Sequence, residues 1–184
     1  MTSPHRQSND FSGPQKLLHW TMAVLILAML FVGVGMVSTV SRAHETLVDL
    51  HRPLGIALLL LVIVRIAVRL RRGSPPLPDS MPPAQRTVAR LSHVVLYALM
   101  VAMPLVGWGM LSAGGYPVTM AGAFHLPPIL PADVRLFALL RTLHAWLAFT
   151  LFGVVLMHLA AALLHGLVLR DGVFGAMAPR RLRP

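Results

Sequence analysis

Four long apolar stretches, separated by short polar or proline-rich links, dominate the chain. They cover about residues 17–37, 48–70, 88–111 and 136–169. Each stretch has the length of about 20 residues that an α-helix needs to cross a hydrocarbon core, and none shows the alternating pattern of a membrane strand. We therefore predict an all-α membrane protein, a four-transmembrane-helix bundle in one compact domain.

The segments outside the apolar stretches set the domain limits. We expect the four-helix domain over residues 14–172, a cytoplasmic N-terminal tail over 1–13 and a basic cytoplasmic C-terminal tail over 173–184, with both tails mobile. The first stretch is too long for the apolar region of a signal peptide, so we expect it to be retained. The long link over residues 112–133 is moderately apolar and is expected to lie on the membrane surface and cover a site.

Composition and charge agree with a membrane protein. The chain has 184 residues, 56% of them hydrophobic and 12% charged, whereas a soluble domain carries about 25% charged residues. It has no cysteine, which excludes disulfides, Cys-ligated iron–sulfur clusters and covalent haem attachment. Its net charge of +10 would suggest nucleic acid as the partner of a soluble protein, but here the placement of the charges matters more.

The basic residues fall mainly on one side of the predicted membrane. If the N-terminus is inside, 12 of the 16 lysines and arginines are cytoplasmic. This asymmetry predicts that both termini are cytoplasmic, and it favours contact with the lipid bilayer and its headgroups over nucleic acid. The cytoplasmic set is Arg6, Lys16, Arg65, Arg69, Arg71, Arg72, Arg86, Arg90, Arg170, Arg180, Arg181 and Arg183.

Two histidines in the last apolar stretch carry the clearest chemical signal. His144 and His158 are 14 residues apart. At 100° per residue this separation is about 40° short of four helical turns, so both rings leave one face, and the rise between them is about 21 Å. A single helix therefore presents an imidazole in each leaflet, and such rings face the bundle interior by default.

Two further histidines match these rings in depth. His19 lies early in the first stretch, at the level of His158, and His51 opens the second stretch, at the level of His144. Two imidazoles on one haem iron leave no open position for oxygen, which suits electron transfer. The pairs His19–His158 and His51–His144 therefore predict two non-covalently bound haems.

Two other interpretations of the four histidines stay open. The rings can hydrogen-bond across helices without any cofactor. Imidazole also suits zinc or copper, although each level offers only two histidines and no adjacent carboxylate or thiolate.

Other residues are weaker candidates. His165 is expected two turns beyond His158 on the same face, as an alternative inner ligand or a partner of a haem propionate. His93 opens the third stretch and is expected either at the membrane interface or beside an inner propionate. Several glycines in the spans suit either the approach of a flat macrocycle or plain helix packing. The cations that could pair with propionates are Arg52, Arg141, Lys16, Arg90 and Arg170.

Taken together, these residues resemble a known family. The segments that carry the resemblance are Leu18-His19-Trp20, His51-Arg52-Pro53-Leu54-Gly55, His93-Val94-Val95-Leu96-Tyr97, His144, His158, His165-Gly166 and Arg170-Asp171-Gly172. They are similar to the prokaryotic cytochrome b561 family, four-helix dihaem cytochromes of the inner membrane, over residues 14–177. One departure is that family members often carry two adjacent histidines where this chain has His165 followed by Gly166.

The resemblance implies two haem b groups with bis-histidine ligation, His19 with His158 on the inner iron and His51 with His144 on the outer iron. It also implies exchange of electrons with ubiquinone or another quinone, and oxidation of superoxide at the outer side in some members.

We therefore expect a quinone-linked oxidoreductase or electron carrier of the bacterial inner membrane. Its donor would be a small anionic one-electron donor such as superoxide, attracted by Arg52, Arg135 and Arg141. The alternatives are a haem-bearing membrane anchor and electron relay for a partner dehydrogenase or hydrogenase, and a histidine-based metal transporter. The direction of electron flow and the oligomeric state stay open.

Overall fold

The computed structural model describes residues 10–78, 80–120 and 124–178. Residues 1–9 and 179–184, for which the sequence predicts cytoplasmic tails, lie outside the described residues. They include Arg6, Arg180, Arg181 and Arg183. Four helices account for most of the described chain, and each is long and apolar enough to cross a membrane. They are α1 (Gly13–Ser38), α2 (Arg42–Arg72), α3 (Pro83–Ala113) and α4 (Val134–Leu163).

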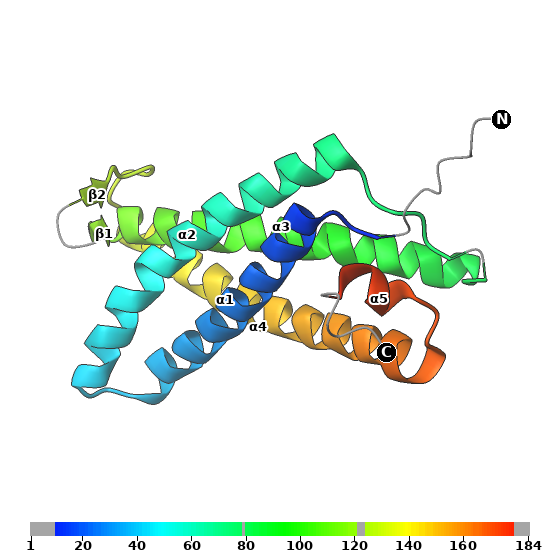
Figure 1. The fold of residues 1–184 in the computed structure, drawn as a ribbon. Helices are drawn as coiled ribbons and strands as arrows, with labels where there is room; N and C mark the ends of the chain where they lie inside the picture. The colour runs from blue at the N-terminus through cyan, green and yellow to red at the C-terminus, as the bar shows by residue number, and fades with distance from the viewer. Residues whose placement is uncertain (1–9, 79, 121–123, 179–184) are drawn as a thin grey trace.

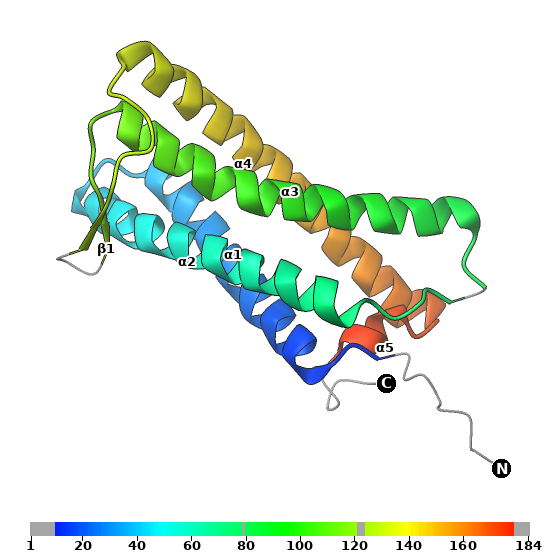
Figure 2. The ribbon, with the colours of Figure 1, turned by 90° about the horizontal axis from the view of Figure 1, so that it is seen from above.

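The four helices form two antiparallel pairs (Figure 1). Helix α1 packs mainly on α2, and α3 packs mainly on α4, while α2 and α3 join the two pairs. Figure 2 shows the pairs from above, with the short strands at one end and the first and last described residues at the other. We call the end with the first and last described residues the inner end and the end with the strands the outer end, following the distribution of basic residues. The predicted four-helix membrane bundle is confirmed.

The buried core is small because much of the apolar surface points outward, as the lipid-facing surface of a membrane helix should. Met22, Leu59 and Val62 form its centre, and Tyr97 packs against them. Large apolar side chains such as Phe31 are exposed on the outside of the bundle. The interior of the bundle therefore contains a few closely packed apolar side chains and the polar side chains of the membrane-spanning helices.

The outer link between α3 and α4 contains a small hairpin that the sequence did not predict. Strands β1 (Val118–Met120) and β2 (Phe124–Leu126) pair antiparallel, and β1 packs on α2. The indole Nε1 of Trp108 donates to the carbonyl of Pro127, and the Ser112 hydroxyl accepts from the backbone N–H of Ile129. These bonds fasten the link over the outer ends of α2 and α3.

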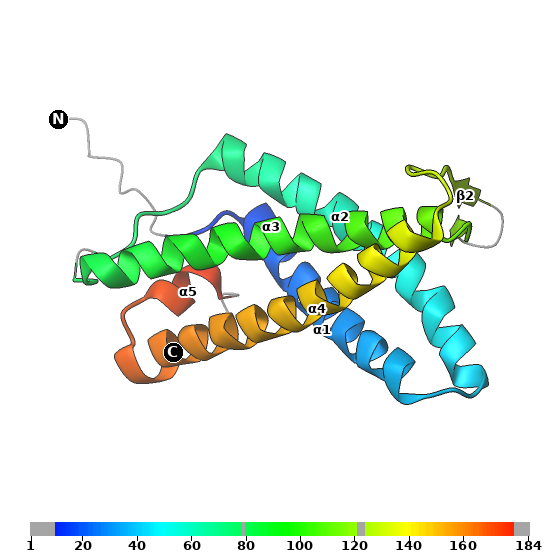
Figure 3. The same cartoon turned by 180° about the vertical axis from the view of Figure 1, so that it is seen from behind.

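The inner end contains local structure that the sequence did not predict. The fourth span, expected over residues 136–169, is α-helical only to Leu163 and ends in a π-helical turn, η1 (Leu164–Leu169). Part of the expected tail forms helix α5 (Val173–Met177), which packs on η1 and on the inner end of α4 (Figure 3). Residues 10–12, also expected in a tail, are held as well, since the N–H of Phe11 donates to the carbonyl of Ala176.

Candidate functional site

Two pairs of histidine rings face each other between the helices, one pair at each level of the bundle. At the inner level, the ring centres of His19 on α1 and His158 on α4 are 6.3 Å apart. At the outer level, those of His51 on α2 and His144 on α4 are 6.2 Å apart. Helix α4 thus contributes one ring to each pair, and the structure brings together the partners that share a depth.

These separations match the space that two imidazoles need on opposite sides of one iron. A histidine nitrogen lies about 2 Å from a bound transition metal and half a ring adds about 1 Å, so two opposed ligands have ring centres about 6 Å apart. Among the described residues no hydrogen bond joins the rings within either pair. The rings within each pair therefore face each other without a direct hydrogen bond, although His19 accepts a bond from a side chain on another helix.

The two histidines of the outer pair, and Arg52 next to His51 in the sequence, have buried nitrogen atoms without hydrogen-bond partners in the described chain. Nδ1 of His51, Nδ1 of His144 and Nε of Arg52 are buried and make no hydrogen bond of good geometry within the described chain, although the Met103 carbonyl lies near His144. Buried donors and acceptors in proteins are nearly always satisfied. An unpaired guanidinium nitrogen on the residue that follows His51 fits a bound group that carries a negative charge, such as a haem propionate.

Glycine makes room for the outer pair on α3. A Cβ atom at Gly107 would lie 3.2 Å from Cε1 and 3.5 Å from Nδ1 of His144, with no other atom within 4 Å. Any larger residue at this position must therefore push the imidazole of His144. For this glycine the structure favours a direct role at the site over plain helix packing.

At the inner level Arg65 contacts His19, which the sequence did not predict. We had expected Arg65 to be one of the cytoplasmic basic residues that set the topology. Instead its Nη2 donates to Nδ1 of His19 over 3.1 Å, and its Nε donates to the Tyr97 hydroxyl over 3.1 Å. The side chain thus points into the bundle rather than out to the surface.

His93 also lies at the inner level, nearer to His158 than expected of an interface residue. Its ring centre is 5.4 Å from that of His158, which is about 1 Å too short for an iron between them. Its Nδ1 donates to the Ala89 carbonyl over 2.6 Å, an arrangement common among metal-binding histidines. The hydrogen bond to Ala89 favours His93 as the ligand opposite His158. The 6.3 Å separation between the rings of His19 and His158, which matches that of the outer pair, favours His19 instead.

One spacing underlies the two levels on all four helices. Positions 14 residues apart share a face and lie about 21 Å apart along the axis. Each helix therefore has one position at the inner level and one at the outer level. With the inner residue named first, these positions are His19 and Gly33 on α1, Arg65 and His51 on α2, His93 and Gly107 on α3, and His158 and His144 on α4. The repeat in His51 and Arg65 is the signal that could have revealed Arg65 in the sequence. At Gly33, a Cβ atom would meet nothing within 4 Å.

The remaining candidates have other surroundings. Nδ1 of His165 lies 2.6 Å from a carboxylate oxygen of Asp171, so this histidine has a partner of its own in the turn after α4. Nζ of Lys16 donates to the Ala178 carbonyl over 3.2 Å and lies 3.6 Å from the Asp10 carboxylate. The structure gives no contact between either histidine pair and the exposed Arg141, Arg90 or Arg170 within the described residues.

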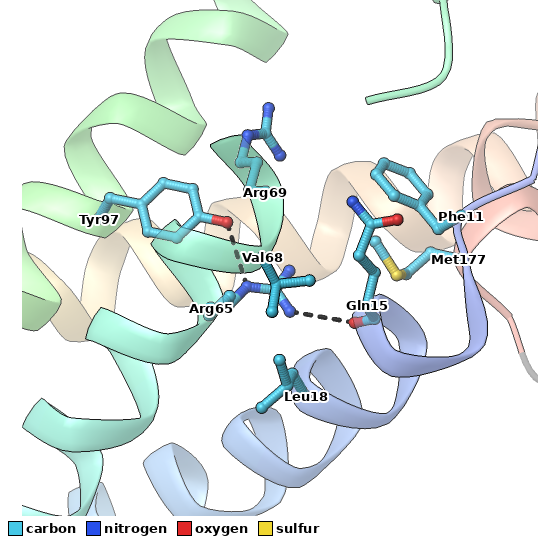
Figure 4. A pocket seen from close by; sticks show the side chains of 8 residues that line it. All are labelled: Phe11, Gln15, Leu18, Arg65, Val68, Arg69, Tyr97 and Met177. Atoms are coloured by element: carbon cyan, nitrogen blue, oxygen red, sulfur yellow. Dashed lines mark hydrogen bonds between the residues drawn. The ribbon is translucent and has the colours of Figure 1, made fainter. Parts of the chain in front are cut away.

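A small cavity adjoins Arg65 at the inner end (Figure 4). Its volume is about 10 Å³, which is room for about one water molecule. Side chains from α1, α2 and α3, from the segment before α1 and from α5 line it. Its lining consists of Phe11, Gln15, Leu18, Arg65, Val68, Arg69, Tyr97 and Met177.

Comparison with known proteins gives a consistent result. The sequence profile of the family described as prokaryotic cytochrome b561 matches residues 10–180. Cytochrome b561 homolog 2 of Escherichia coli is 30% identical over 162 residues, which are 86% of each chain. The probable superoxide oxidase CybB of Yersinia pestis is 28% identical over 165 residues, 89% of this chain and 93% of its own. Cytochrome b561 homolog 1 of Escherichia coli is 26% identical over 176 residues, 94% and 99% of the two chains.

Proposed function

Because the chain belongs to the prokaryotic cytochrome b561 family, we propose that it conducts electrons through the bacterial inner membrane on two b-type haems. Membership makes it a multi-pass membrane electron-transfer protein that binds b-type haem. The number of haems, their ligands and their redox partners are the content of the proposal. The observation that carries it is the pair of ring separations, 6.3 Å and 6.2 Å, at two levels of one bundle.

In this proposal each haem has one ligand on α4. His19 and His158 hold the inner iron, and His51 and His144 hold the outer iron. A haem iron with two imidazole ligands cycles between its ferric and ferrous forms without binding oxygen. Arg52 pairs with a propionate of the outer haem, since its buried Nε has no partner among the described residues. Lys16, Arg141 and His165 remain candidates for the propionates only if their side chains turn from their present positions.

The proposed reaction is one-electron transfer between a donor at the outer end and the quinone pool. Of the three arginines expected to attract an anion, Arg52 is assigned to a propionate, and Arg135 and Arg141 place positive charge at that end, which favours the approach of a small anion. A relative from Yersinia pestis is named a probable superoxide oxidase, and this supports superoxide as the donor to test first. Ubiquinone or another membrane quinone is the proposed acceptor.

The first experiment counts haems in the purified protein and in two variants. A pyridine haemochrome assay should give two b haems per chain, and His144→Ala and His158→Ala should each lose a different one. His44→Ala is the control, because His44 is exposed and its Nδ1 donates to the Met36 carbonyl, away from both pairs. A well-folded wild type without haem, or two variants that lose the same haem, would contradict the proposal.

A second experiment tests the partners. The oxidised protein alone, in detergent with a short-chain ubiquinone analogue, is mixed with superoxide, and reduction of its haems and then of the quinone is followed optically. Reduction by superoxide or by quinol supports a redox function of its own. A protein that neither reagent reduces would favour the role of a relay subunit for a partner dehydrogenase.

A further inference from the structure

A groove lies between the inner ends of α1 and α2. Its volume is about 810 Å³, far more than that of the small cavity beside Arg65. The segment before α1, the first turn of α1, the last residue of α2 and the link after α2 line it. Among the described residues, its lining has two cations, Lys16 and Arg72, and one carboxylate, that of Asp10. The groove is therefore a positively charged recess at the level of the inner membrane surface.

The guanidinium of Arg72 is available for a ligand. Its side chain is exposed and makes no hydrogen bond or ion pair with any described residue. Two other arginines lie three and seven residues earlier on α2, near the same face. The guanidinium of Arg69 lies over the ring of Tyr97, and Arg65 makes three hydrogen bonds inside the bundle. Arg72 thus continues a row of cations to the surface, with its own donors unused.

The ammonium group of Lys16 supplies the second cation, from α1. Its Nζ donates to the Ala178 carbonyl over 3.2 Å and lies 3.6 Å from the Asp10 carboxylate. An ammonium has three N–H donors, so these two contacts leave one donor for a ligand in the groove. With one carboxylate against two cations, the described lining keeps a net positive charge.

An apolar stripe on α1 runs from the groove along the membrane-spanning part of the helix. Gly13 lines the groove, and positions 17, 24 and 31 lie within about 40° of it around the helix. These positions hold Leu17, Val24 and Phe31, which are 71%, 64% and 76% exposed. A ligand with a charged head in the groove could therefore lay an apolar chain along this stripe, which a free inorganic anion could not use.

We propose that the groove between Lys16 and Arg72 binds an anionic phospholipid of the inner leaflet, with its phosphate between the two cations and an acyl chain along the exposed stripe of α1. Basic pockets between membrane helices on the cytoplasmic side suit such headgroups. A guanidinium donates strong, charge-assisted hydrogen bonds to phosphate oxygens. The site does not include either histidine pair, so the inference does not depend on how the haems are ligated.

The test is a lipid titration of the purified full-length protein in neutral detergent, with binding of the first lipid followed by native mass spectrometry. Phosphatidylglycerol should bind more tightly than phosphatidylcholine, whose headgroup has no net charge. Arg72→Gln should weaken phosphatidylglycerol binding about fivefold, because one arginine near an anionic lipid contributes about 1 kcal/mol. Arg72→Lys, which keeps the charge, should weaken it less. Arg71→Gln is the matched control, since Arg71 is also exposed on α2 but does not line the groove, and it should leave the affinity nearly unchanged.

Several results would overturn the inference. Equal affinities for the two lipids would show that the groove does not recognise an anion. Equal losses in Arg72→Gln and Arg71→Gln would show that the general positive charge of the inner end attracts lipid without a site. Inorganic phosphate that displaces phosphatidylglycerol at equal concentration would make the groove a site for the free ion.

A second variant keeps the test decisive if Arg72→Gln does not fold. Ser74→Glu places a negative charge on the exposed link that lines the groove, outside every helix. It should weaken phosphatidylglycerol binding and leave phosphatidylcholine binding unchanged, because only the anionic headgroup is repelled. Undiminished binding of phosphatidylglycerol to this variant would contradict the proposed site.

Discussion

Gly107 gives the most direct test of the outer site, because a Cβ atom there would meet only His144 outside its own helix. A Cβ atom at this position would lie 3.2 Å from the imidazole, about 0.5 Å inside an ordinary carbon contact of 3.5–4.0 Å. Alanine therefore requires the ring to shift by about 0.5 Å, which is near the tolerance of a functional site. Leucine extends about 2 Å further and should displace the ring altogether.

The expected result is graded. Gly107→Ala should keep two haems with an altered potential of the outer one, and Gly107→Leu should reduce the pyridine haemochrome count from about two haems per chain to about one. The haem lost should be the one that His144→Ala removes. The helix itself should tolerate both changes, because either residue is a better helix former than glycine by up to about 1 kcal/mol.

Gly153→Leu is the matched control. It lies nine residues after His144, about half a turn around α4 and so on the opposite face, and a Cβ atom there would meet nothing within 4 Å. It should keep both haems. If Gly107→Leu also kept two haems with unchanged spectra, His144 would not hold the outer iron in the orientation seen here.

Three further predictions concern the inner end. His93→Ala should keep both haems while His19→Ala loses the inner one, and the reverse pattern in the haemochrome assay would make His93 the ligand. Trp20→Phe removes the 3.1 Å bond from Nε1 to a carbonyl of α5 and should lower the stability by about 1 kcal/mol, seen in thermal unfolding, without changing the haem count. Asp171→Ala breaks the 2.6 Å contact with His165 and should cost about 1.5–3 kcal/mol; an unchanged melting temperature would show that this turn contributes nothing.

The helices and the two histidine levels could be predicted from the sequence for simple reasons. Four apolar runs of membrane-spanning length leave little choice of fold. A rotation of 100° per residue then relates His144 to His158 without any knowledge of tertiary structure. Depth within the membrane pairs each with one partner, since a ring in one leaflet cannot reach the other.

The short elements at the two ends could not be predicted in the same way. Strands of three residues and a helix of five, Val173–Met177, are too short for a period to appear in the sequence. Their positions depend on tertiary bonds, such as that from Trp108 to the Pro127 carbonyl. The turn from α4 into η1 likewise depends on Asp171, whose carboxylate holds His165.

Arg65 shows a different limit. An arginine near the inner end of a span looks the same in sequence whether it extends to the headgroups or turns into the bundle. Only the structure shows that its partners are neutral groups on α1 and α3. Its distance of 14 residues from His51 places it on the interior face, and this spacing distinguishes it from Arg72, which lies exposed at the end of the same helix.

The two sites therefore differ in more than their depth. Both lie near an arginine, but Arg52 has a buried nitrogen without a partner among the described residues, and a propionate bound there would neutralise its charge. Arg65 instead makes three hydrogen bonds to neutral groups on α1 and α3, so the cation nearest the inner pair already has partners within the protein.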